Sequence, residues 1–108
     1  MATYTNTSYA AKNVGTSAST LVTVASATTA AVASLIVSNT TVSPITTSVY
    51  FTRSGVDYYL VYGATIPVGG SLEVIQGNRV VLVASDILKV VNSAASSGDA
   101  IASVLLAA

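Results

Sequence analysis

Cysteine and histidine are both missing from this chain of 108 residues. Without cysteine the chain forms no disulfide, and it has no thiol nucleophile and no thiolate ligand for zinc. Without histidine it lacks the commonest general base, most zinc sites and the imidazole of Ser-His-Asp arrangements. We therefore expect no cofactor, no bound metal and no enzymatic activity.

Charge is also scarce, because charged side chains make up 7% of the residues, whereas about 25% is usual. Four basic and four acidic residues give a net charge of zero. A surface this poor in charge has little protection against self-association, which favours a homo-oligomer held in a larger assembly. No nucleic-acid partner is expected, since phosphate backbones are bound by clustered basic residues. The basic residues here are scattered singly, at Lys12, Arg53, Arg79 and Lys89.

The four acidic residues are not paired in the sequence, so a glycosidase pair would have to be assembled from separate strands. We expect a structural role for each of them, with Asp57 facing Thr52 across a turn and Asp86 capping its own backbone. The alternative is a hydrolase built from such separate carboxylates, whose activity would be lost in Asp57→Asn or Asp86→Asn. The remaining acidic residues are Glu73 and Asp99.

Long hydrophobic runs are absent as well. The two most apolar stretches, residues 30–37 and 100–108, are far shorter than the ~20 residues that cross a bilayer as a helix. The first 15 residues have neither the basic nor the apolar region of a secretory signal. We expect no membrane partner and no secretory export.

What the chain does contain is short runs of Val, Ile, Thr and Tyr, separated by Gly, Pro, Ser and Asn. Such residues fit a pleated, half-buried surface, so each run predicts a strand. Eight closely spaced strands indicate a single antiparallel β-sandwich, all-β and jelly-roll-like, over residues 19–108. We place the strands near residues 19–24, 30–38, 45–53, 56–62, 71–76, 79–84, 86–92 and 99–106.

Residues 1–18 differ from the rest, because they are small, polar and without clear periodicity. One interpretation is a disordered tail. The other, which we adopt, is an extended N-terminal arm that lies on a neighbouring subunit and is held there by Tyr4 and Tyr9.

Four of the six tyrosines and the single phenylalanine gather in residues 49–62, around Ser54-Gly55. A two-residue turn at Ser54-Gly55 would place Tyr50 opposite Tyr59 and create a hairpin with two distinct faces. One face, read as the core face, would carry Val49, Phe51, Val56, Tyr58, Leu60 and Tyr62. The other would carry Ser48, Tyr50, Thr52, Asp57, Tyr59 and Val61.

A second hairpin is predicted around Gly77-Asn78, with Ile75 opposite Val80. Both of its faces would carry apolar side chains, which is typical of a strand pair covered on both sides or of a subunit interface. We therefore add Ile75 and Leu82 to the interface candidates.

The tyrosines of the first hairpin admit three interpretations. A cross-strand aromatic pair stabilises a sheet by ~0.2–1 kcal/mol without any partner. Tyrosine is also enriched in protein interfaces, where it gives a large contact area and a polar tip. Stacking on sugar rings is the third interpretation. The complete set of interface candidates is Tyr4, Tyr9, Tyr50, Tyr59, Val61, Ile75 and Leu82.

From residue 32 to 106 the chain resembles a family of small β-sandwich virion structural proteins of tailed bacteriophages. The segments that carry the resemblance are "SLIVSNTT", "RSGVDYYLVYGATIPVGGSLEVI", "RVVLVASDILKV" and "DAIASVLL". Where the family often has Gly before the Asp, this chain has Ser85-Asp86, which puts the type of that turn in doubt.

The resemblance implies a non-enzymatic structural protein of the phage particle. The first expectation is a capsid decoration, or cement, subunit that stabilises the head through subunit contacts, with a trimer favoured. Its partners would be the phage major capsid protein or other virion proteins, and it would be assembled into the virion in the host cytoplasm. The alternatives are a tail, neck or baseplate subunit, or a carbohydrate- or receptor-binding module of a tail fibre.

Overall fold

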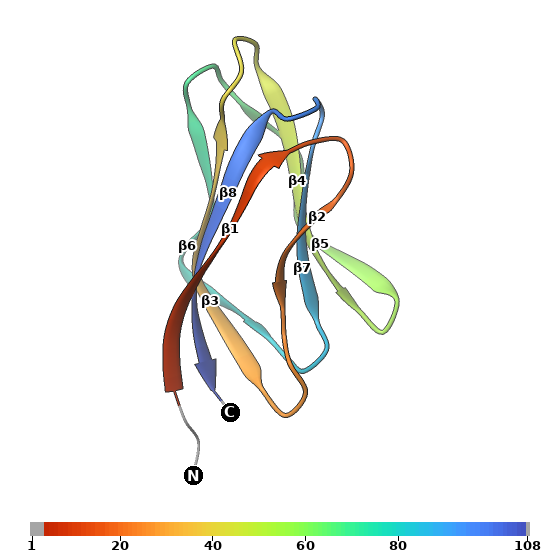
Figure 1. The fold of residues 1–108 in the computed structure, drawn as a ribbon, viewed down its shortest axis with the longest axis vertical. Coiled ribbons are helices and arrows are strands. Elements are labelled where there is room, and N and C mark those ends of the chain that lie inside the picture. Colours follow the sequence, from red (N-terminus) through yellow and green to blue (C-terminus); the bar gives the residue numbers. More distant parts are fainter. Residues whose placement is uncertain (1–3, 108) are drawn as a thin grey trace.

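The computed structural model describes residues 4–107, and the side chains of all of these except residues 76–78. The described residues form eight strands and no helix, which confirms the expected all-β class (Figure 1). The strands are β1 (Tyr4–Val14), β2 (Ser19–Thr23), β3 (Thr29–Asn39), β4 (Ile45–Arg53), β5 (Val56–Ile66), β6 (Ser71–Leu82), β7 (Ile87–Asn92) and β8 (Gly98–Ala107).

The strands form two four-stranded antiparallel sheets that face each other as a sandwich. The first sheet has the order β1-β8-β3-β6, and the second has the order β2-β7-β4-β5. Neighbours in both sheets are mostly distant in the sequence, and successive strands alternate between the sheets except β4 and β5, which are neighbours in the second sheet. This connectivity is that of a jelly roll, so the expected architecture is confirmed.

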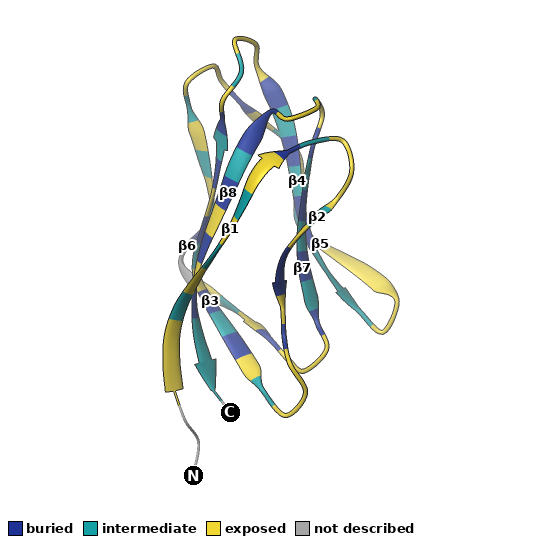
Figure 2. Cartoon of the chain, in the orientation of Figure 1, coloured by how far each residue is buried: buried dark blue, intermediate teal, exposed yellow. Residues whose placement is uncertain are grey.

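The core between the sheets is built from Val, Leu, Ile and Ala side chains. Alternation along the strands creates it: in β3, Leu35 and Val37 are buried, whereas Ile36 between them is exposed. The same alternation appears along β8 in Figure 2. None of the aromatic side chains belongs to this buried cluster, although Tyr9 and Phe51 pack against it. The positions of the exposed tyrosines must therefore be explained by something other than filling the core.

Residues 4–14 form strand β1 of the first sheet, which corrects the expectation of an N-terminal arm separate from the sandwich. The strand pairs with β8, from Tyr4 opposite Ala107 to Ala11 opposite Ala100. Val14 at its end is fully buried in the core. The pairing covers one edge of β8, which would otherwise expose unpaired backbone groups.

The hairpin predicted at Gly77-Asn78 is wrong. Strand β6 continues through these residues and pairs with β3 along its length, from Ser71 opposite Ser38 to Leu82 opposite Ala30. Two register shifts accommodate the extra residues of β6. Because the strand does not turn back, most of its apolar side chains pack against the core, and Val81 is exposed on the outer side. Two of the interface candidates, Ile75 and Leu82, are buried in the core.

The side chain of Asn39 forms hydrogen bonds that connect the loop after β3 to the end of β5. Its Nδ2 donates to the carbonyls of Ser43 at 2.9 Å and Ile66 at 3.1 Å, and its Oδ1 accepts from the Thr41 N–H at 2.8 Å.

We expect Asn39→Ala to lower the free energy of unfolding by about 2 kcal/mol, because buried backbone groups lose their partners. Urea denaturation tests this, with Thr40→Ala in the same loop as the control. Equal stabilities of the two variants would contradict the role of Asn39.

Candidate functional site

The carboxylates of the described residues do not gather into a catalytic or metal-binding group. No cluster of three or more His, Cys, Asp or Glu residues occurs among the residues that the structure places. Asp57 accepts a hydrogen bond from the Thr52 hydroxyl at 2.7 Å, and Asp99 lies 3.6 Å from the Lys12 ammonium. Within the described range there is also no helix of the length and hydrophobicity needed to cross a membrane.

Asp86 is the one carboxylate that is almost completely buried, with 1% of its side chain exposed. Arg53 donates to it twice, from Nε to Oδ1 at 3.0 Å and from Nη2 to Oδ2 at 2.6 Å. The N–H of Val83 donates to Oδ2 at 2.9 Å, which is the turn cap expected from the sequence. The hydrogen bonds from Arg53 are the largest of the effects on the pKa of Asp86, and they lower it. Burial raises this pKa, and the hydrogen bond from the Val83 N–H lowers it further, so that the pKa lies below its ordinary value.

This ion pair joins the tip of the β4–β5 hairpin to the turn between β6 and β7. It is structural, because Arg53 and Val83 occupy the carboxylate oxygens. The hairpin itself projects away from the sandwich, as the green segment of Figure 1 shows. Arg53 therefore holds a projecting element in a fixed position relative to the second sheet.

The tip of the hairpin is the predicted two-residue turn. Ser54 and Gly55 both have positive φ, at 52° and 78°, as a type I′ turn requires. The register beside the turn is also as predicted, with Tyr50 opposite Tyr59 and Thr52 opposite Asp57.

Further from the turn the register differs from the prediction. Val49 lies opposite Val61 while Tyr50 lies opposite Tyr59, so Leu60 is an extra residue in β5. This β-bulge reverses the facing of the residues that follow it. Val61, an interface candidate, therefore packs against the core, and Tyr62 moves to the outer face, where 79% of it is exposed.

The outer face of the hairpin carries a continuous row of rings that we call the tyrosine face, made of Tyr50, Tyr59 and Tyr62. The Tyr50 and Tyr59 ring centroids are 4.9 Å apart, and those of Tyr59 and Tyr62 are 5.0 Å apart in an edge-to-face arrangement. Lys89 on β7 places its ammonium 6.0 Å from the Tyr50 ring. Desolvation, followed by the charge of Asp57, raises the pKa of Tyr59.

The inner face of the same hairpin is also aromatic. Phe51 and Tyr58 stack with centroids 5.2 Å apart, and the Arg53 guanidinium lies 5.1 Å from the Phe51 ring. Tyr58 is 48% exposed and Val56 is 51% exposed. Apolar groups thus remain in contact with solvent on both sides of the hairpin.

A second exposed surface covers the outer side of the first sheet, which we call the first-sheet face. Ala10, Ile101, Ile36 and Glu73 form one row across its four strands. Ser8, Ser103 and Ser34 form the next row, and Asn6, Leu105, Ala31 and Val81 the one after it. Ile101 is 53% exposed and Val81 56%. Charged groups, among them Glu73 and the Lys12–Asp99 pair, lie at its margins.

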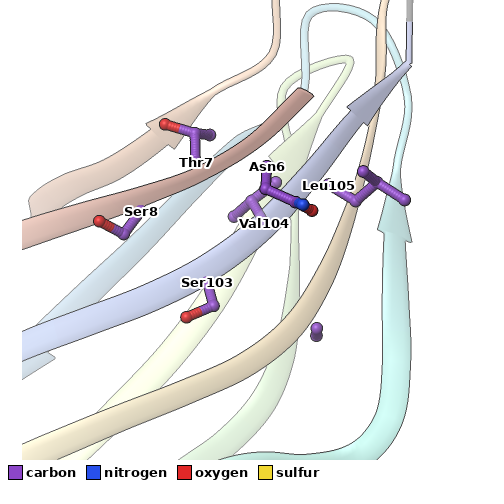
Figure 3. Close-up of a pocket in the computed structure, with 7 residues that line it drawn as sticks. Asn6, Thr7, Ser8, Ser103, Val104 and Leu105 are labelled. Atoms are coloured by element: carbon purple, nitrogen blue, oxygen red, sulfur yellow. The ribbon is translucent and has the colours of Figure 1, made fainter. Parts of the chain in front are cut away.

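A shallow hollow of about 430 Å³ lies in this face (Figure 3). Its origin is a β-bulge in β3, where Val32 pairs with Val104 and Ser34 with Ser103, which leaves Ala33 as an extra residue. The short Ala33 side chain leaves a space that is lined by hydroxyl, amide and apolar groups. The other lining residues are Asn6, Thr7, Ser8, Ser103, Val104 and Leu105.

The seven interface candidates therefore have different positions. Tyr4 is 68% exposed and Tyr59 is 49% exposed, so these two are available to a partner. Tyr50 is 9% exposed beneath its neighbours, and Tyr9 packs partly against the core. Val61, Ile75 and Leu82 contact the core. Three exposed residues, Tyr62, Ile36 and Ile101, are not among the candidates predicted from the sequence. For the two isoleucines a signal was present, because each is an apolar residue at an outward-facing position of an alternating strand.

No protein-family model and no curated protein matches the sequence. The fold is that of a jelly-roll β-sandwich. Among solved structures, the chain is similar to one from work in which "Bacillus endospore appendages form a novel family of disulfide-linked pili". The two are 12% identical with a TM-score of 0.52, over 97% of this chain and 86% of that one. At this identity the likeness shows a shared fold.

Proposed function

We propose that this chain is a non-enzymatic structural subunit that acts in many copies within a protein particle. The observation that carries the proposal is the first-sheet face, where Ile36, Ile101 and Val81 are exposed among small Ser and Ala side chains. Exposed apolar groups such as the neighbouring Ile36 and Ile101 are typical of interaction surfaces. The small side chains and the scarcity of charge allow a flat partner to approach without leaving charges desolvated.

Within this class we propose a decoration subunit on the head of a tailed bacteriophage, with the major capsid protein as its partner. The resemblance of residues 32–106 to small virion proteins supports this finer assignment. A modest interface repeated over many copies gives strong overall attachment, which suits a subunit with two separate exposed surfaces. Tail, neck and baseplate positions are alternatives that use the same surfaces.

A filament subunit is the second candidate, and the fold shared with the Bacillus appendage protein favours it. Those pili are described as disulfide-linked, whereas this chain has no cysteine. A filament of this chain would therefore be held together by non-covalent contacts alone.

A sugar-binding module is less well supported. The planes of Tyr59 and Tyr62 are 84° apart, so the two exposed rings do not form one flat platform for a sugar.

We expect Ile101→Lys to reduce the amount of subunit bound to purified particles by about tenfold or more. The reason is that an unpaired ammonium would have to be desolvated at the contact. Quantitative mass spectrometry of particles after rebinding measures this. Val42→Lys is the matched control, because Val42 is 92% exposed in a loop far from this face and should leave binding unchanged. Equal binding of the wild type and Ile101→Lys would reject the first-sheet face as the contact.

Gold-labelled antibody imaging of particles from the source tests the finer assignment. Label spread over the heads is the result expected for decoration. Label confined to tails would replace decoration with a tail role, and label along extracellular filaments would support the second candidate.

A further inference from the structure

The tyrosine face carries one positive and one negative group at diagonally opposite corners. Lys89 lies on β7 beside Tyr50, whereas Asp57 lies on β5, two residues from Tyr59 and directly opposite Thr52. Neither forms an ion pair with any residue that the structure describes. Both are on the outer side of the second sheet and in contact with solvent.

The spacing of these groups follows from the sheet. Lys89, Tyr50 and Tyr59 stand in one row across β7, β4 and β5. Strands are about 4.8 Å apart, so Lys89 is about 10 Å from Tyr59, and Asp57 is about 7 Å further along β5. The Tyr50–Tyr59 pair thus separates the two charges, and a line that passes between its rings leaves Lys89 on one side and Asp57 on the other.

We propose that the tyrosine face binds a second copy of this chain through a twofold-symmetric contact. The twofold axis lies in the plane of the face and follows the line that passes between the Tyr50 and Tyr59 rings, with Lys89 on one side and Asp57 on the other. Rotation about this axis brings Lys89 of each copy against Asp57 of the other. The same operation packs the Tyr59 ring of one copy against the tyrosine pair of the other. In such an interface each contact occurs twice, so a single Lys and a single Asp form two ion pairs.

A second copy fits this face better than an unrelated partner because the face is complementary to itself. A like-charged face would repel a second copy, whereas one charge of each sign, placed symmetrically about the aromatic centre, attracts it in one orientation. The central rings supply apolar contact, since Tyr59 is 49% and Tyr62 79% exposed. The contact is small compared with the ~800 Å² per partner of stable complexes, so we expect micromolar affinity.

This inference rests on the proposed role as an assembly subunit, and it names one of the partners. Analytical ultracentrifugation of the purified chain over a micromolar to millimolar series tests it. The wild type is expected to form dimers. Lys89→Glu and Asp57→Lys should each weaken dimerisation by about tenfold or more, because two like-charged contacts replace two ion pairs. The double variant Lys89→Glu/Asp57→Lys should recover the wild-type dimer, since it restores both pairs with the charges exchanged.

Arg79→Glu is the matched control, because it makes the same change of charge at an exposed residue of β6, in the other sheet, and should leave dimerisation unchanged. Circular dichroism establishes that each variant is folded. A monomeric wild type, or a double variant as weak as the single ones, would overturn the proposal. The particle-binding assay is separate: particles that still bind a monomeric chain would leave the proposed function intact, and dimers that never bind particles would reject that function alone.

Discussion

Asp86→Asn is expected to lower the free energy of unfolding by about 3 kcal/mol at pH 7, although the substitution keeps the size of the side chain. The buried carboxylate accepts charged hydrogen bonds from Arg53 and a further one from the Val83 N–H. An asparagine amide in its place carries no charge. Its NH₂ group would face an N–H donor of Arg53 or Val83 and could not accept a hydrogen bond from it. The projecting β4–β5 hairpin would then lose its attachment to the β6–β7 turn.

The same variant should reveal the lowered pKa of Asp86 through the pH dependence of stability. A carboxyl group whose pKa is lower in the folded state stabilises the protein at pH values above its unfolded pKa of about 3.9. That contribution is lost as the pH falls through the folded-state pKa. The difference in stability between the wild type and Asp86→Asn is therefore expected to be constant above about pH 5 and to shrink below pH 4.

Urea denaturation over a pH series measures both effects, and urea is preferable to guanidinium because it does not screen charge. Asp57→Asn is the matched control, since Asp57 is an exposed carboxylate with a hydroxyl partner, and it should change stability by less than about 0.5 kcal/mol. A pH-independent difference between the wild type and Asp86→Asn would contradict an ionised Asp86 in the folded protein.

Gly98→Ala is expected to destabilise the fold by about 3 kcal/mol or more, although it adds a single methyl group. A Cβ at Gly98 would overlap with the backbone oxygen of Ser38 and would lie 2.9 Å from the Asn92 side-chain nitrogen. Strand β8 lies between β1 and β3 at this point, opposite both Val14 and Asn39, so the backbone has little room to move. Thermal and urea denaturation measure the loss.

Gly15→Ala provides the comparison for this position. Its Cβ would approach the Ser96 nitrogen at 3.2 Å, which a small local shift can relieve, so its cost should be clearly smaller. Comparable stabilities of the two alanine variants would mean that the first sheet is more adaptable at Gly98 than its close contacts indicate.

Local patterns in the sequence were sufficient to predict much of the fold. Alternating Val, Ile and Leu residues located seven of the strands approximately, because a strand between a core and solvent must alternate. Ser54-Gly55 predicted the turn and the register beside it, since a two-residue loop determines which residues are opposite. These inferences depended on neighbours in the sequence.

Features that depend on distant partners were not predictable in the same way. Asp86 and Arg53 are 33 residues apart, so their pairing appears only when β4 and β7 come together. The bulge at Leu60 changes the facing of Val61 and Tyr62, and no local residue pattern marks it. The sequence predicts an arm in place of strand β1, because the small polar residues of this segment have weak alternation and its partner β8 lies at the other end of the chain.

The strand order also determines when the protein can fold during its synthesis. In the first sheet β8 separates β1 from β3, and in the second sheet β7 separates β2 from β4. A nascent chain that ends before residue 87 therefore lacks a central strand in both sheets. The apolar faces of the earlier strands therefore remain uncovered until about the last fifth of the described chain has emerged from the ribosome. Contacts between such distant segments also make folding slow, which gives chaperones time to bind before the two sheets are complete.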